Sequence, residues 1–150
     1  MVGGHSVSRE IKFRAWVENE HIKNGPYPFM NQHIEFMGGL INDIFATSGK
    51  EPLNSLHNKI TYMQYTGLKD AKGKEIYEGD IVDYLGDIDH INSNVLRVIE
   101  YKNEEACFVA RLPVGVDGEE AVYLNEHDFK VVGNIYENPT LLEELQNGTK

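Results

Sequence analysis

Cysteine is almost absent from this 150-residue chain, in which Cys107 stands alone. A single cysteine excludes a disulfide within the chain, so we expect the protein to work in a reducing compartment, the cytoplasm. Cys107 lies in the apolar run of residues 106–110. This setting predicts a small buried hydrophobic side chain rather than a nucleophile.

Long hydrophobic runs are also lacking. No apolar stretch approaches the roughly 20 residues that a membrane-spanning helix needs, and no secretory signal is visible at the start. We therefore predict no membrane association. Residues 1–8 are small and unpatterned, which indicates a disordered start or a cloning remnant. Residues 9–150 suit one domain with an insertion near residues 18–59.

Positive charge is scarce, because 14 Lys and Arg residues stand against 24 Asp and Glu residues, for a net charge of −10. Binding to a phosphate backbone depends on Lys and Arg displacing counterions, so this balance disfavours nucleic acid as a partner. Three lysines do meet in one turn and form the candidate nucleic-acid patch: Lys69, Lys72 and Lys74. High negative charge suits plain solubility, and it would also suit an acidic mimic of DNA.

Motifs of catalysis and metal binding are missing as well. The chain has no nucleophile elbow, phosphate loop, dinucleotide fingerprint or zinc-ligand spacing. Its six histidines are scattered, and the nearest arrangement to a metal site is Asp87, Asp89 and His90 in a polar stretch. Such a stretch is more typical of a solvated loop than of a cation site. We therefore predict no enzymatic activity, no metal and no cofactor.

What the chain does contain is a series of short strand patterns separated by turn residues. Residues 9–17 alternate as a half-buried strand, with Phe13 and Ala15 on the apolar face and Arg14 and Trp16 on the polar face. Further strand patterns follow in residues 62–84, 95–101, 106–112, 120–124 and 129–136. Short strands at this spacing indicate a small barrel or sandwich.

The insertion of residues 18–59 is the least regular part. Apolar residues within 32–46 follow a helical spacing, but Gly38 and Gly39 interrupt it. Because each glycine costs about 1 kcal/mol in a helix interior, a broken helix and two short extended pieces both remain open.

A short helix is predicted at the C-terminal end. Asn138 suits the N-cap, Pro139 the first helical position and Gly148 the end of the helix. Its apolar face needs burial, either on the barrel or on another chain, and consists of Leu141, Leu142 and Leu145.

Residues 62–84 read as a compact β unit with two tight turns. The residues that we expect to shape these turns are Gly67, Asp70, Gly73, Gly79 and Asp80. Asp70 can accept a hydrogen bond from its own backbone two residues on, and Gly73 can take a positive φ. Asp80 could act as a catalytic carboxylate, but a turn aspartate that fixes the entry to the next strand is favoured.

Aromatic residues gather in the same segment and form the candidate binding surface: Trp16, Tyr62, Tyr65, Tyr77 and Tyr84. In a small barrel, such residues can form a groove for a peptide ligand or stack on single-stranded bases. The alternative is that they pack the core with their hydroxyl groups at its rim.

The segment YMQYTGLKDAKGKEIYEGDIVDY resembles the signature of the YopX-like family of phage and prophage proteins, whose members read much like QYTGLKDKNGKEIYEGDIV. The opening REIKFRAWV and the closing VVGNIYENPTLLEEL are also similar to that family. The resemblance implies an SH3-like barrel core. The sequence therefore predicts a mainly β protein: a small SH3-like barrel with an irregular or partly helical insertion and a C-terminal helix.

The function that we expect is a non-enzymatic, phage- or prophage-encoded module in the cytoplasm of the bacterial host. It would bind a protein partner or assemble with itself as a homo-oligomer. The alternative is a nucleic-acid-associated protein in phage replication or regulation, or an acidic DNA mimic. A hydrolase that uses Asp80, or Asp87 with Asp89, has the least support.

Overall fold

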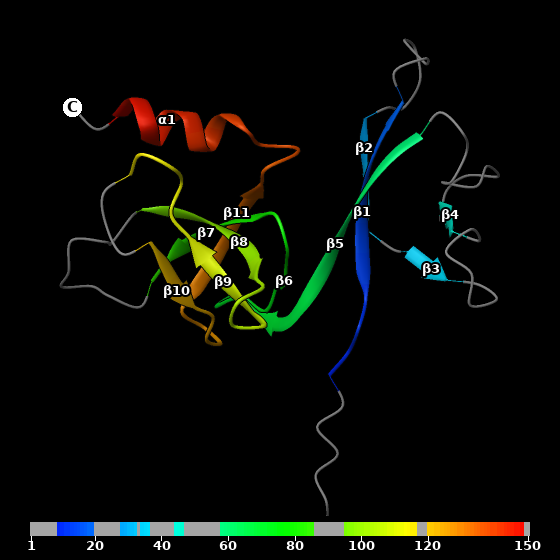
Figure 1. Cartoon of the computed structure of the whole chain (residues 1–150), viewed down its shortest axis with the longest axis horizontal. Coiled ribbons are helices and arrows are strands. Elements are labelled where there is room, and N and C mark those ends of the chain that lie inside the picture. Colours follow the sequence, from blue (N-terminus) through cyan, green and yellow to red (C-terminus); the bar gives the residue numbers. More distant parts are fainter. Residues whose placement is uncertain are drawn as a thin grey trace, which may run out of the picture.

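The computed structural model describes seven parts of the chain: residues 9–19, 28–32, 34–36, 44–46, 58–85, 95–116 and 120–148. Within them the protein is mainly β, with one helix, α1 (Thr140–Gly148), near the C-terminal end (Figure 1). The predicted fold class is confirmed. Residues 1–8, Asp87, Asp89 and His90 lie outside the described parts.

One sheet is built around the longest strand, β5 (Asn58–Lys69). It pairs antiparallel with β1 (Phe13–Asn19) on one side and with β6 (Glu75–Tyr77) on the other. The short strand β2 (Phe29–Asn31) completes the order β2-β1-β5-β6. In Figure 1, one end of β5 lies beside β1 and β2, and the other end reaches β6 and the five-stranded sheet.

The other large sheet has five antiparallel strands. They are β7 (Asp80–Tyr84), β8 (Leu96–Lys102), β9 (Cys107–Arg111), β10 (Ala121–Tyr123) and β11 (Phe129–Asn134), in the order β10-β9-β8-β7-β11. The chain thus forms a meander before β11 returns beside β7. This curled sheet is compatible with the expected SH3-like barrel, whose finer topology stays a prediction.

The main core lies on one face of the five-stranded sheet. Its buried residues are Ile76, Val82, Ile99, Ala110, Phe129 and Val131. Ile76 comes from β6 of the other sheet, and the remaining five lie on β7, β8, β9 and β11, where alternate residues of a strand share one face. Burying the Ile, Val and Phe side chains of this set contributes about 1.5–3 kcal/mol each.

The strand β1 corrects one sequence prediction. It was expected to be half-buried, with Arg14 and Trp16 on a polar face, but both side chains are buried. The reason is that both faces of the strand are covered: Ala15 and Val17 pack with residues of β2, β3 and β5, while Trp16 stacks on Tyr136 at 5.7 Å between ring centroids. A strand with two covered faces buries its polar residues too.

The described part of the insertion is extended. The strands β3 (Ile34–Phe36) and β4 (Ile44–Ala46) form an antiparallel pair. Of the two alternatives that the sequence leaves open for residues 32–46, the described residues take the extended one. Gly38 and Gly39 lie outside the described parts of the chain.

The helix α1 is fixed to β11 by a compact connection. The Asn138 N–H donates to the Asn134 carbonyl at 2.9 Å, and the Asn134 N–H donates to Asn138 Oδ1 at 3.2 Å. A Cβ added at Gly133 would lie 3.0 Å from Leu141 Cδ1. The helix therefore packs at least part of its apolar face on the five-stranded sheet of its own chain.

Candidate functional site

A buried ion pair joins the two sheets. Arg14 on β1 and Asp80 at the start of β7 approach to 2.6 Å between Nη2 and Oδ1, and their side chains are 5% and 1% exposed. Asp80 Oδ2 also accepts the Tyr77 N–H at 2.8 Å. The Arg14 guanidinium lies 4.8 Å from the centroid of the Tyr77 ring and donates to the Glu78 carbonyl at 3.3 Å.

The surroundings of Asp80 indicate that this ion pair stabilises the fold. Burial raises the pKa of Asp80, and the nearby Arg14 charge and the Tyr77 N–H oppose that rise. Both carboxylate oxygens are engaged, so Asp80 holds the β6–β7 turn against β1. Sequence reasoning placed Arg14 on a polar face and missed its pair with Asp80, because the two residues lie 66 positions apart and no local pattern connects them.

Asp70 organises the turn between β5 and β6 and links it to β11. Its Oδ1 accepts the N–H groups of Lys72 and Lys74 at 2.9 and 2.8 Å, and its Oδ2 accepts that of Val131 at 2.9 Å. Burial opposes ionisation of Asp70, but the three backbone donors outweigh it and lower the pKa of the carboxyl group below its ordinary value. The contact to Val131 has no signal in the sequence.

The expected turn glycines take left-handed backbone conformations: φ is +89° at Gly67, +83° at Gly73 and +77° at Gly79. A Cβ at Gly79 would also lie 3.3–3.5 Å from Tyr136, Ile135 and Met63. Conformation and close packing together thus favour glycine there.

The candidate aromatic residues do not form one surface. Tyr65 and Tyr77 are buried against each other, with 5.5 Å between ring centroids, and Tyr84 packs on Phe129 at 5.2 Å. Trp16 is buried on Tyr136, as described above. Tyr62 has the largest exposed fraction among the candidates, 38%.

The three candidate lysines are exposed: Lys69 is the last residue of β5, and Lys72 and Lys74 lie in the connection to β6. Glu75 follows directly and forms an ion pair with Lys12. In the described parts of the chain, no group of three His, Cys, Asp or Glu side chains is arranged to hold a metal ion.

A polar cleft of about 580 Å³ lies where the two sheets meet; it is called the Arg9 cleft below. It is lined by Arg9, Gln64, Glu78, Tyr101 and Asn103. Glu78 Oε2 accepts the Gln64 N–H at 2.7 Å, which holds the Glu78 carboxylate in place. Two charged side chains, two amide side chains and one tyrosine, from separate parts of the chain, thus line the Arg9 cleft.

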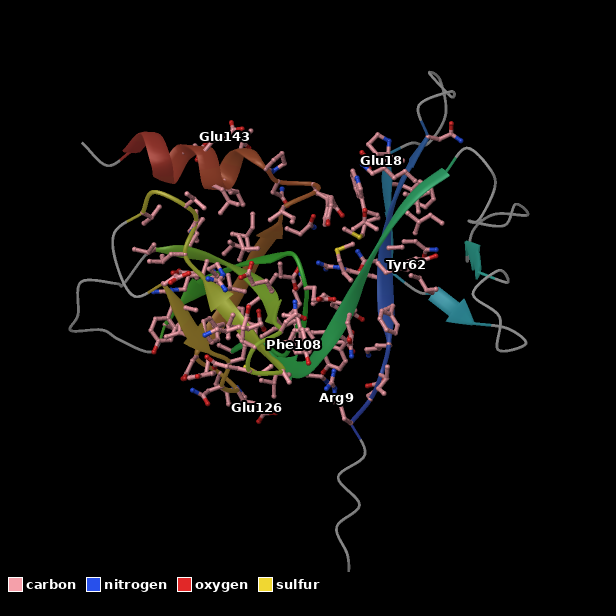
Figure 2. The ribbon with its side chains drawn as sticks, viewed as in Figure 1. Arg9, Glu18, Tyr62, Phe108, Glu126 and Glu143 are labelled. Atoms are coloured by element: carbon pink, nitrogen blue, oxygen red, sulfur yellow. The ribbon has the colours of Figure 1, made fainter. Side chains whose placement is uncertain are left out.

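Aromatic side chains border this cleft. Arg9 lies over the Phe108 ring, with 5.5 Å from its guanidinium carbon to the ring centroid, and Figure 2 labels both side chains beside the end of β5. Tyr101, 41% exposed, meets Phe108 edge-on at 5.2 Å. Tyr101 and Phe108 are cross-strand partners on β8 and β9. The hairpin register could have indicated that pair, but nothing local could have indicated Arg9.

Within the described residues, no helix has both the length and the apolar character needed to cross a membrane. No curated protein gives a match to this chain. Among solved structures, the chain is similar to the crystal structure of protein EF1440 from Enterococcus faecalis. The two share 27% identity and a TM-score of 0.48 over 90% of this chain and 99% of that one. Residues 12–143 match the YopX protein family, and the chain therefore belongs to that family.

Proposed function

We propose that the protein is a non-catalytic module, encoded by a phage or prophage and working in the cytoplasm of its bacterial host, that binds protein through the Arg9 cleft. The observation that carries this proposal is the contact of Arg9 and Tyr101 with Phe108 beside a cleft of about 580 Å³. Arg and Tyr are among the residues that dominate binding energy at protein interfaces.

The polar lining of the cleft supports the same role. Gln64, Glu78 and Asn103 offer hydrogen-bonding groups around the aromatic pair. The bond from the Gln64 N–H to Glu78 restrains that carboxylate before any partner arrives, and a restrained group loses less entropy on binding. A second copy of this chain is the first partner to test, because self-assembly is part of the proposal.

The use of the buried carboxylates supports a non-catalytic role. Asp80 binds Arg14 through one oxygen and the Tyr77 N–H through the other. Asp70 uses both oxygens for backbone N–H groups. A carboxylate engaged in this way serves as a fixed anchor of the fold, so these two residues are better explained by structure than by acid–base chemistry.

The test is the solution mass by light scattering after size-exclusion chromatography, at low and high salt, with and without a single-stranded DNA oligonucleotide. We expect a discrete oligomer whose mass is unchanged by DNA. Tyr101→Ala should weaken the association about 10- to 30-fold, as truncation of a central interface residue does. Tyr62→Ala is the matched control, because Tyr62 is similarly exposed but does not line the cleft.

Three results would change the interpretation. A monomer that gains mass only with DNA, and loses the gain at high salt, would favour the nucleic-acid alternative through Lys69, Lys72 and Lys74. A monomer that ignores DNA would exclude self-assembly and leave a host protein as the partner. Equal weakening by Tyr101→Ala and Tyr62→Ala would contradict the Arg9 cleft as the interface.

A further inference from the structure

The Arg9 cleft carries one cation and one anion that do not pair with each other. Its two charged lining residues are Arg9 and Glu78. Neither forms an ion pair within the described parts of the chain. The Arg9 guanidinium instead contacts the Phe108 ring, and the Glu78 carboxylate accepts the Gln64 N–H at 2.7 Å. The cleft thus offers a partner both a positive and a negative group.

The neighbouring charges are already engaged with one another. Glu10, next to Arg9 in the sequence, forms an ion pair with Lys12 at 3.2 Å. The guanidinium of Arg14 donates to the Glu78 carbonyl, but its ion pair is with a different carboxylate, that of Asp80. A direct ion-pair partner for Arg9 or for the Glu78 carboxylate would therefore come from a bound molecule.

Apolar and aromatic surface adjoins these two charges. Tyr101, in the lining of the cleft, is 41% exposed. Ile11, two positions from Arg9, is 68% exposed. Exposed apolar and aromatic groups beside charged ones are typical of a protein interface, where they form the centre and the rim. This composition suits a protein partner better than a small ion.

The two charges of opposite sign favour a second copy of this chain as that partner. In a two-fold interface the same patch lies on both sides, so each contact between two different residues occurs twice. A patch with one available cation and one available anion meets this condition, because Arg9 can face the partner's Glu78 while Glu78 faces the partner's Arg9. A partner surface of a single charge sign would pair with one of them and repel the other.

We propose that two copies of this chain associate through their Arg9 clefts about a two-fold axis, with two symmetric ion pairs between Arg9 of one protomer and the partner's Glu78. Tyr101 and Ile11 supply the apolar contact. This inference rests on the proposed function and deepens it, since it names the partner, the symmetry and the paired residues. A two-fold contact closes on itself, so the product is a dimer.

The test is the dissociation constant of the dimer, measured on the full chain by analytical ultracentrifugation. Arg9→Glu, at an exposed position, replaces both ion pairs with like-charge contacts and should weaken the dimer about 100-fold. Glu78→Gln keeps an acceptor for the Gln64 N–H and should weaken the dimer about 2- to 30-fold, the loss of two exposed ion pairs. Thermal unfolding of each variant checks that the fold is retained.

The effect of Glu78→Gln should change sign in the Arg9→Glu background. There Glu78 faces a like charge of the partner, so its removal should tighten the dimer about tenfold. Glu143→Gln is the matched control, because it removes the same charge from an exposed position of α1, which Figure 2 shows at the opposite end of the view from Arg9. It should change the dissociation constant little in either background.

Failure of this inference and failure of the proposed function give different results. A wild-type monomer, or an oligomer of odd number, overturns the two-fold dimer, and the monomer leaves a host protein as the partner of the cleft. A dimer that Tyr101→Ala weakens but Arg9→Glu does not keeps the cleft as the interface and overturns the charge pairing. The pairing is also overturned if Glu78→Gln weakens both backgrounds equally. A dimer that neither Tyr101→Ala nor Arg9→Glu weakens overturns both proposals.

Discussion

Arg14 and Asp80 form an ion pair with 2.6 Å between Nη2 and Oδ1, and both side chains are almost fully buried. The pair joins β1, near the start of the chain, to β7 in the five-stranded sheet. Because it lies between the two sheets, the pair ties β1 and the four-stranded sheet to the five-stranded sheet. Breaking it should therefore affect the whole domain.

Arg14→Met should lower the free energy of unfolding by about 3–5 kcal/mol, because it leaves the Asp80 carboxylate buried with only the Tyr77 N–H as a partner. Urea unfolding measures this change. Lys59→Met is the control, since it removes an exposed pair with Glu18 at 3.7 Å and should cost less than about 1 kcal/mol.

The double variant Arg14→Met/Asp80→Asn should lose less than the sum of the two single variants, because neither unpaired charge is then left inside. Additive losses would show that the two side chains act independently, in contradiction to their geometry.

Asp70→Asn should lower the free energy of unfolding by about 2–3 kcal/mol at neutral pH, since hydrogen bonds to a charged group are lost. The native pKa of Asp70 lies below its unfolded value, so its stabilisation is complete above the ordinary carboxyl pKa of about 3.9. It is lost as the pH falls through the lower, native pKa.

The difference between wild type and Asp70→Asn should therefore shrink at acidic pH, as measured by urea unfolding between pH 7 and the acid transition. Glu104→Gln, at an exposed position of the β8–β9 turn, serves as the control and should change little. A difference that stays constant with pH would contradict the role of the Asp70 charge.

Ala106→Gly should stabilise the protein. Ala106 has a φ of +52°, a left-handed conformation that costs a residue with a Cβ about 1–2 kcal/mol. Part of this gain is offset by the greater freedom of glycine in the unfolded chain, so we expect a net gain of about 0.5–1 kcal/mol by thermal unfolding. Ala71→Gly is the control: Ala71 is not among the residues of positive φ, so only the loss should appear.

Leu141→Asp should lower the free energy of unfolding without changing the solution mass. Leu141 is half-buried, and its Cδ1 lies close to Gly133 on β11. A charge at this contact should cost about 1–3 kcal/mol. Thermal unfolding and light scattering on the same sample measure the two effects. Dissociation of an oligomer at unchanged stability would instead place the helix face between chains.

Much of the local structure could be predicted from the sequence, because it depends on neighbouring residues. The C-terminal helix follows from Pro139, Gly148 and the leucine spacing, and the strands follow from their alternation, whereas the Asn138 side chain, expected to cap the helix, accepts the Asn134 N–H. The bond from the Lys72 N–H to Asp70 is of the same kind, since the two residues are two positions apart.

The candidate site could not be predicted in this way. The Arg9 cleft joins Arg9, Gln64 and Tyr101 from separate elements, and the buried ion pair joins Arg14 on β1 to Asp80 at the start of β7. The tyrosines within residues 62–84 are not one surface: Tyr65 and Tyr77 pack together, while Tyr62 lies an odd number of positions from Tyr65 on β5 and therefore faces the other side. Closeness in the sequence therefore does not predict which of these tyrosines share a surface.

The family follows from the wording of the sequence itself, and the mainly β class, the turns and the helix follow from conformational preferences of residues close together in the chain. The burial of Arg14 and its pairing with Asp80 depend instead on contacts between residues far apart in the chain, because a strand buries its polar residues only when other elements cover both of its faces. On one face of β1, Ala15 and Val17 pack with Ile34 of β3 and with Phe29 and Ile60 of the neighbouring strands; on the other face, Trp16 contacts Tyr136 and Arg14 contacts Tyr77 and Asp80.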